Sequence, residues 1–133
     1  MNKYNKPLLG FTVGVWDLLH EGHLDLLQRC KNQCDYLIVA IMNDYWVMVQ
    51  KGIGRPKQPL QLRYNILKDQ NICDKIIILD TLDMTPYLQI CDIWFKGEDQ
   101  IKMKPDNFSN IIIIKHNINI STTKLLNVKK GNK

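Results

Sequence analysis

Residues 35–42 read DYLIVAIM, an apolar run with no polar residue from Leu37 to Met42. A continuous apolar run of this length is typical of a strand that is buried on both faces of a parallel sheet. Similar short runs lie on either side of it along the chain, at residues 8–14, 75–79, 92–96 and 110–115. The pattern therefore predicts a sheet of about five strands that are rich in β-branched residues.

Segments with helical periodicity separate these runs. In residues 22–33 the side chains of Leu24, Leu27 and Cys30 fall on one side of a helix. Further helices are expected at residues 60–70, 85–90 and 121–128, and a loop at residues 51–59. This alternation indicates an α/β fold, with a parallel sheet of about five strands and helices on both faces. Ligands of such sheets bind beyond the carboxyl ends of the strands.

Length and composition predict one soluble globular domain. It would cover residues 1–128 of the 133, with a disordered basic tail at residues 129–133. Hydrophobic residues make up 45% and charged residues 23%, the balance of an ordinary soluble protein. No apolar run reaches the length of a membrane span and no signal peptide is visible, so a cytoplasmic location without a membrane partner is expected. The four cysteines are expected to be reduced thiols, because their spacing does not match a zinc site.

The net charge of +5 owes much to lysines near the two ends of the sequence. Only three arginines occur, and no basic stripe alternates with aromatic residues. A nucleic-acid partner is therefore disfavoured. A surplus of cationic groups suits a protein that binds a polyphosphate.

The segment GVWDLLHEGH, residues 14–23, follows the first predicted strand and opens the first predicted helix. His20 and His23 lie three positions apart in it, and Gly22 lets a ligand approach the backbone closely. The start of a helix offers unpaired N–H groups and a positive dipole end, which favour a phosphate. One alternative is that the two histidines are partly exposed residues of a helix start. A metal site is disfavoured, because the HEGH spacing differs from that of the metalloprotease signature.

Two further clusters follow later in the chain. Residues 51–63, KGIGRPKQPLQLR, combine a basic loop with the helix start at which it ends, and they include two arginines, whose guanidinium groups can grip phosphate oxygens. Residues 120–124, ISTTK, place consecutive hydroxyl groups at the start of the last predicted helix. Taken singly, the first is more often a solvated loop and the second an ordinary helix cap. Their order with the histidine segment is more specific.

Together these segments resemble the cytidylyltransferase-like nucleotidyltransferases, over residues 8–126. GVWDLLHEGH is similar to the family's G-x-F-D-x-x-H-x-G-H signature (the HxGH motif), with Trp16 at the usual phenylalanine. DLLHEGH, CDYLIVAI and ISTTK look like the glycerol-3-phosphate cytidylyltransferases, whereas KGIGRPKQPLQLR and FKGED look like the nucleotidyltransferase domain that forms ADP-heptose. The resemblance implies a Rossmann-like nucleotidyltransferase fold.

The resemblance also implies roles for individual residues. His20 and His23 would be catalytic and hold the α-phosphate, and Lys51 would reach the triphosphate. The nucleotide-binding residues would be Gly14, Val15, Asp17, Arg63, Gly97, Asp99, Ser121, Thr122 and Thr123. Among these, Asp17 would face the nucleotide and its metal, and Arg63 would anchor phosphate charge. Arg55 and His116 are candidates for further phosphate contacts.

The implied activity is transfer of a nucleoside monophosphate, CMP from CTP in the first instance, to a phosphorylated small molecule such as glycerol 3-phosphate. Pyrophosphate would be released, Mg²⁺ would accompany the triphosphate without fixed protein ligands, and a homodimer is expected. Two alternatives stay open: an ATP-dependent adenylyltransferase acting on a sugar phosphate, and a catalytically weakened nucleotide-binding protein. The latter is motivated by His116 and Asn71, which stand where the cytidylyltransferase branch carries arginine.

Overall fold

The computed structural model describes residues 6–97 and 111–114. In chain order the elements are β1 (Leu9–Gly14), α1 (Glu21–Lys31), β2 (Tyr36–Met42), α2 (Asp44–Lys51), α3 (Leu60–Asp69), β3 (Lys75–Leu79), α4 (Thr85–Leu88), β4 (Ile93–Gly97) and β5 (Ile111–Ile114). The five strands form one parallel sheet in the order β3-β2-β1-β4-β5. The predicted α/β fold with a parallel sheet of about five strands is confirmed.

The sheet has its topological switch point between β1 and β4. From β1 the chain adds β2 and β3 on one side, and then β4 and β5 on the other. In open parallel sheets, ligands bind at the carboxyl ends of the strands that flank this switch point. The turn that leaves β1 therefore lies where this fold builds its binding sites.

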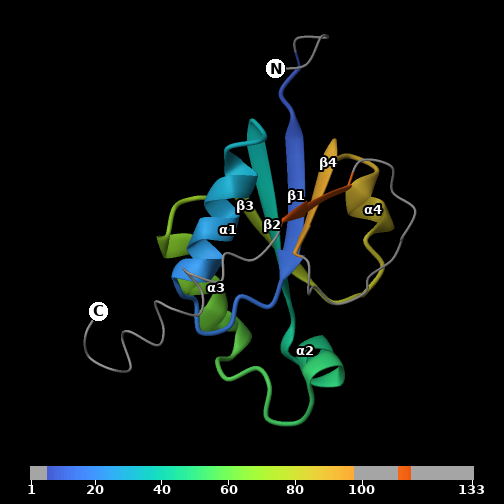
Figure 1. Cartoon of the computed structure of the whole chain (residues 1–133). Helices are drawn as coiled ribbons and strands as arrows, with labels where there is room; N and C mark the ends of the chain where they lie inside the picture. Colours follow the sequence, from blue (N-terminus) through green and yellow to red (C-terminus); the bar gives the residue numbers. More distant parts are fainter. Residues whose placement is uncertain (1–5, 98–110, 115–133) are drawn as a thin grey trace, which may run out of the picture.

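Side chains of β2 alternate between two hydrophobic clusters, one on each face of the sheet. Leu37, Val39 and Ile41 belong to the cluster that includes residues of α1 and α3. Ile38, Ala40 and Met42 belong to the other, which includes residues of α2 and α4. In Figure 1, α1 and α3 cover one side of the sheet, and α4 lies on the other. Burial on both faces explains why β2 reads as a continuous apolar run.

Helix α2 was not expected from the sequence. The side-chain oxygen of Asn43 accepts a hydrogen bond from the backbone N–H of Trp46 at 2.9 Å, which caps the helix start. The helix and the loop after it lie beyond the carboxyl ends of the central strands (Figure 1). The basic loop that the sequence predicted at residues 51–59 therefore begins at the last residue of a helix. The helix expected at residues 121–128 lies outside the described residues.

Two other expectations from composition concern membranes and thiols. No helix in the described part of the chain combines the length and the apolar character that a bilayer crossing requires. All four cysteines are free thiols, as expected. Burial raises the pKa of the Cys30 thiol to about 12 and that of Cys91 to about 11.

Candidate active site

The turn between β1 and α1 has an unusual backbone. Trp16 and Leu18 have φ values of 55° and 52°, in the left-handed region that residues with a Cβ rarely adopt. The Trp16 indole is buried, and its Nε1 donates a hydrogen bond to the carbonyl oxygen of Ala40 in β2 at 3.0 Å. A Cβ on Gly14 would lie only 2.8 Å from Cε2 of Trp16. Gly14 is therefore required where the indole folds back over the end of β1.

The two motif histidines close the start of α1 together. His20 is the N-cap residue, and its Nδ1 accepts a hydrogen bond from the backbone N–H of Gly22 at 2.9 Å. The Nδ1 of His23 accepts one from the backbone N–H of His20 at 3.1 Å. This reciprocal arrangement is a capping box built from two imidazoles. The alternative interpretation as helix-start residues therefore describes part of what these histidines do.

The cap hydrogen bonds also fix the chemistry of both rings. A neutral imidazole whose Nδ1 accepts a hydrogen bond carries its proton on Nε2. Both rings are half-buried, their centroids lie 4.1 Å apart, and the rings of Trp16 and His23 form a T-shaped contact. Two neighbouring Nε2–H donors at a helix start form an arrangement that suits an anion.

The carboxylate of Asp17 is directed at the basic loop. Oδ2 accepts a hydrogen bond from the backbone N–H of Lys57 at 2.7 Å, and Oδ1 accepts one from that of Gln58 at 3.0 Å. Asp17 is also buried, with 9% of its surface exposed. The resemblance implied that Asp17 faces the nucleotide and its metal. That role stays a prediction, and in the structure both oxygens bind the loop.

Arg63, near the start of α3, is completely buried. Its Nη1 donates to the carbonyl oxygens of Val15 at 2.8 Å and Met42 at 2.9 Å, and its Nε donates to that of Gln58 at 2.9 Å. Its Nη2 pairs with Oδ1 of Asp44 at 2.5 Å. These protein oxygens surround the guanidinium. The expected contact between Arg63 and a phosphate likewise stays a prediction.

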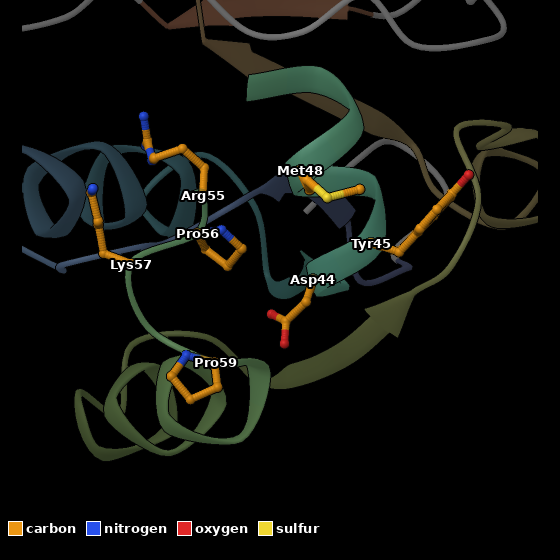
Figure 2. A pocket seen from close by; sticks show the side chains of 7 residues that line it. All are labelled: Asp44, Tyr45, Met48, Arg55, Pro56, Lys57 and Pro59. Carbon is orange, nitrogen blue, oxygen red and sulfur yellow. The ribbon is translucent and has the colours of Figure 1, made fainter. Parts of the chain in front are cut away.

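The cations of the basic loop lie nearer to solvent. Lys51 is exposed at the end of α2, and Arg55 is half-buried. The buried Nε of Arg55 lies 3.9 Å from Oδ2 of Asp17, with no hydrogen-bond partner among the described residues. Arg55 and Lys57 extend in the same direction from the loop, at one side of a surface cavity of about 470 Å³ (Figure 2). This cavity is lined by Asp44, Tyr45, Met48, Arg55, Pro56, Lys57 and Pro59.

The structure describes only some of the other expected site residues. Val15 follows β1, and its carbonyl oxygen is held by Arg63. Gly97 ends β4 and pairs with Ile114 of β5. The remaining expected contacts lie outside the described residues: Asp99, His116, Ser121, Thr122 and Thr123.

Two further residues, Gln58 and Asp44, hold this region together and were not predicted from the sequence. Gln58 contacts Asp17 and Arg63 through its backbone, and its Oε1 accepts a hydrogen bond from the N–H of Leu18 at 3.0 Å. Asp44 pairs with Arg63 and opens α2. An acidic residue at a helix start is a visible signal in the sequence. Nothing in the sequence marks Gln58, because its contacts with Asp17 and Leu18 join segments that are distant in the sequence.

Asn71 has a local structural explanation. It follows α3 in the left-handed conformation, with φ at 57°, and its N–H donates to the carbonyl oxygen of Lys68 at 3.1 Å. Asparagine adopts this conformation more readily than most residues and is a common residue after a helix end. The departure from arginine at this position therefore suits the helix end, whatever it does to activity.

The sequence matches the model of one protein family and parts of known proteins. The model of the cytidylyltransferase-like family matches residues 11–128. The bifunctional protein HldE of Caulobacter vibrioides is 42% identical over 95 residues, which are 68% of this chain and 19% of that protein. HldE of Acidiphilium cryptum is 36% identical over 94 residues, again 68% of this chain and 19% of that protein. The chain thus spans less than a fifth of the length of these relatives.

A solved structure supports the fold. The lipopolysaccharide core biosynthesis protein from Thermoplasma volcanium superimposes with a TM-score of 0.68, over 84% of this chain and 97% of that chain. The two sequences are 23% identical, so the likeness shows the fold alone. That fold is the Rossmann-like nucleotidyltransferase fold, with the parallel sheet described above.

Proposed function

This chain belongs to the cytidylyltransferase-like family, and from that premise we propose that it transfers AMP from ATP to a sugar phosphate and releases pyrophosphate. The observation that carries the transfer reaction is the pair of Nε2–H donors at the start of α1, at the carboxyl end of β1 and beside a basic loop. This arrangement suits a reaction in which charge develops on a phosphate.

The choice of ATP and a sugar phosphate replaces the first expectation of CTP and glycerol 3-phosphate. The basic loop resembles the domain that forms ADP-heptose, and we infer that the HldE relatives belong to the same branch. Three segments resembled the cytidylyltransferases. Two of them, the histidine turn (residues 14–23) and β2, serve the shared fold, and the third is residues 120–124. The residues that line the cavity come from α2 and the basic loop, so we give the loop more weight.

The acceptor supplies its own nucleophile. The second pKa of a phosphate monoester is about 6, so an oxygen is already anionic at pH 7 and needs no general base. It attacks the α-phosphorus, a new P–O bond forms, and the bond to the β-phosphate oxygen breaks with pyrophosphate leaving in line. The main obstacle is the approach of two anions, which positioning and charge neutralisation overcome.

The described residues divide this task. The Nε2–H groups of His20 and His23 would donate to the oxygens of the α-phosphate, where negative charge grows as the acceptor attacks. Lys51 and Arg55 would neutralise the phosphates of either substrate. The dipole at the start of α1 adds to the same field.

Mg²⁺ would enter this site with the triphosphate. Among the described residues no group of three or more His, Cys, Asp or Glu side chains could hold a metal ion. Asp17, the residue that the resemblance directs to the metal, has each carboxylate oxygen bound to a backbone N–H. The present arrangement of Asp17 does not fit a metal ligand, and no step above depends on one.

Pyrophosphate release tests the proposal. Purified protein with Mg²⁺ would be given ATP or CTP, each with hexose phosphates, heptose phosphates or glycerol 3-phosphate. We expect release with ATP and a sugar phosphate, and much less with CTP and glycerol 3-phosphate. The reverse preference would restore the CTP reading. Nucleotide binding without release from any pair would favour a weakened nucleotide-binding protein instead.

A further inference from the structure

We propose that Asp17 and Arg63 are positioning residues that clamp the basic loop, residues 52–59, onto the histidine turn, and that neither touches the nucleotide. The clamp consists of Asp17, Arg63 and Gln58, together with the ion-pair partner Asp44. Its catalytic consequence rests on the proposed function, whereas its structural part does not.

Arg63 joins four parts of the chain. Its acceptors lie after β1, at the end of β2, at the start of α2 and in the basic loop. These bonds use four of the five N–H groups of a guanidinium. The side chain has no exposed surface, and the carboxylate of Asp44 balances its charge. A phosphate would have to displace several of these bonds to reach it.

Asp17 holds the loop by its backbone. Consecutive N–H groups, those of Lys57 and Gln58, donate to the two oxygens of one buried carboxylate. Hydrogen bonds to an ionised acceptor are the stronger kind. A hard cation such as Mg²⁺ would compete for the same oxygens. The geometry therefore favours a loop anchor over a metal ligand.

Gln58 connects the two charged residues to the strained part of the turn. Its N–H donates to Asp17, its carbonyl oxygen accepts from Arg63, and its side-chain oxygen accepts from the N–H of Leu18. Leu18, with its positive φ, lies two residues before His20. The turn is thus held at Val15 by Arg63 and at Leu18 by Gln58.

This arrangement couples loop position to histidine position. A shift of reacting groups by about 1 Å can cost about 100-fold in rate, so a clamp that fixes the turn affects turnover without contacting substrate. The same clamp fixes the backbone from which Arg55 and Lys57 extend (Figure 2). Release of the loop would move these cations away from the turn.

Limited proteolysis of the ligand-free protein tests the clamp without reference to activity. The loop contains a bond that trypsin can cut, after Lys57, and mass spectrometry identifies the fragment that ends there. Asp17→Asn keeps the shape of the side chain but turns one acceptor oxygen into a donor that faces a backbone N–H. We expect cleavage after Lys57 to become about tenfold faster, the scale for one lost hydrogen bond to a charged group.

Matched variants separate the clamp from general effects of charge removal. Asp25→Asn makes the same chemical change in α1, where Asp25 forms a partly exposed ion pair with Arg29, and should leave cleavage after Lys57 unchanged. Gln58→Ala removes the side-chain bond to Leu18 and should give an intermediate acceleration. Arg63→Lys, with Arg29→Lys as its control, should accelerate cleavage as well. Should Arg63→Lys not fold, the variants of Asp17 and Gln58 carry the test.

Kinetics then distinguish positioning from ligand binding. If Asp17 and Arg63 position the turn, Asp17→Asn lowers kcat and changes the KM for ATP much less. Cleavage at the wild-type rate in both Asp17→Asn and Gln58→Ala, together with a raised KM for ATP in Asp17→Asn, would overturn the clamp. Wild-type protein that transfers no nucleotide to any acceptor, with cleavage still accelerated in the variants, would reject the proposed function and leave the clamp standing.

Discussion

The Nδ1 atom of His23 accepts a hydrogen bond from the backbone N–H of His20 at 3.1 Å. The second histidine of the motif therefore closes the helix start that the first one caps. Because both Nδ1 atoms accept hydrogen bonds, both rings carry a proton on Nε2. Under the proposed function, the structural role falls to Nδ1 and the catalytic role to Nε2 of the same ring, and substitutions can separate them.

His20→Asn tests this separation. The side-chain oxygen of asparagine is a good helix cap, so the free energy of unfolding should stay within about 0.5 kcal/mol of wild type, whereas His20→Ala should lose about 1 kcal/mol. Both variants lack the Nε2–H donor, and kcat should fall about 100-fold or more in each. Urea unfolding and pyrophosphate release measure the two effects. Wild-type turnover in His20→Asn would remove this histidine from catalysis.

Gly14→Ala should destabilise the protein through Trp16. The added Cβ would lie 2.8 Å from the indole, and overpacking of this kind costs about 1–3 kcal/mol. The same substitution should cost less in a Trp16→Phe background, because phenylalanine lacks the indole atoms nearest to Gly14. A double-mutant cycle by urea unfolding measures the coupling. An equal cost in both backgrounds would show that the indole is not what excludes a side chain here.

Buried thiols should make the fold sensitive to alkali. Burial, with a smaller effect from the neighbouring Cys34, raises the pKa of Cys30 to about 12, above the value of about 8.5 that a free thiol has. Since the folded state holds this proton more tightly, the free energy of unfolding is unaffected below about pH 8.5 and falls as the pH rises towards 12, by up to about 1.4 kcal/mol per pH unit. Urea unfolding at a series of pH values measures this slope.

Cys30→Ala isolates the contribution of that thiol, since other groups titrate alike in both proteins. The decline above pH 8.5 should be shallower in the variant, although its stability near neutral pH should be lower because Cys30 is fully buried. Identical slopes in the two proteins would contradict a raised pKa at Cys30.

Asn71 should tolerate glycine and resist branched or long side chains. Asn71→Gly should leave the free energy of unfolding unchanged or slightly higher, whereas Asn71→Arg should lower it by about 1 kcal/mol, because φ is 57°. Thermal or urea unfolding measures both. A stable Asn71→Arg variant with gained activity on glycerol 3-phosphate would instead show that this residue selects the branch of the family.

The sheet could be predicted from the sequence for a physical reason. β2 is a continuous apolar run that is buried on both faces, and β3 and β5 are short runs of isoleucine, which favours strands. Helix α2 was missed because it is only eight residues long and includes Trp46, Val47 and Val49, which are weak helix formers. Its start signal, Asn43 followed by Asp44, was visible but short.

The candidate site could be predicted from the sequence only in part. The motif identified the histidine turn and the basic loop, since both depend on local sequence. It did not predict that Asp17 and Arg63 bind protein oxygens and N–H groups, because those contacts depend on where residues 52–59 settle relative to β1. Gln58 illustrates the limit: its three contacts involve residues at least five positions away.

The proposed function requires the histidine turn to act on the innermost phosphorus of a nucleotide. The most direct measurement follows ATP labelled at the α-phosphorus, incubated with Mg²⁺ and a sugar phosphate. We expect the label to appear in a nucleotide sugar with wild-type protein, and at least about 100-fold more slowly with His20→Asn. Label that stays in ATP, or is transferred equally fast by His20→Asn, would contradict the claim.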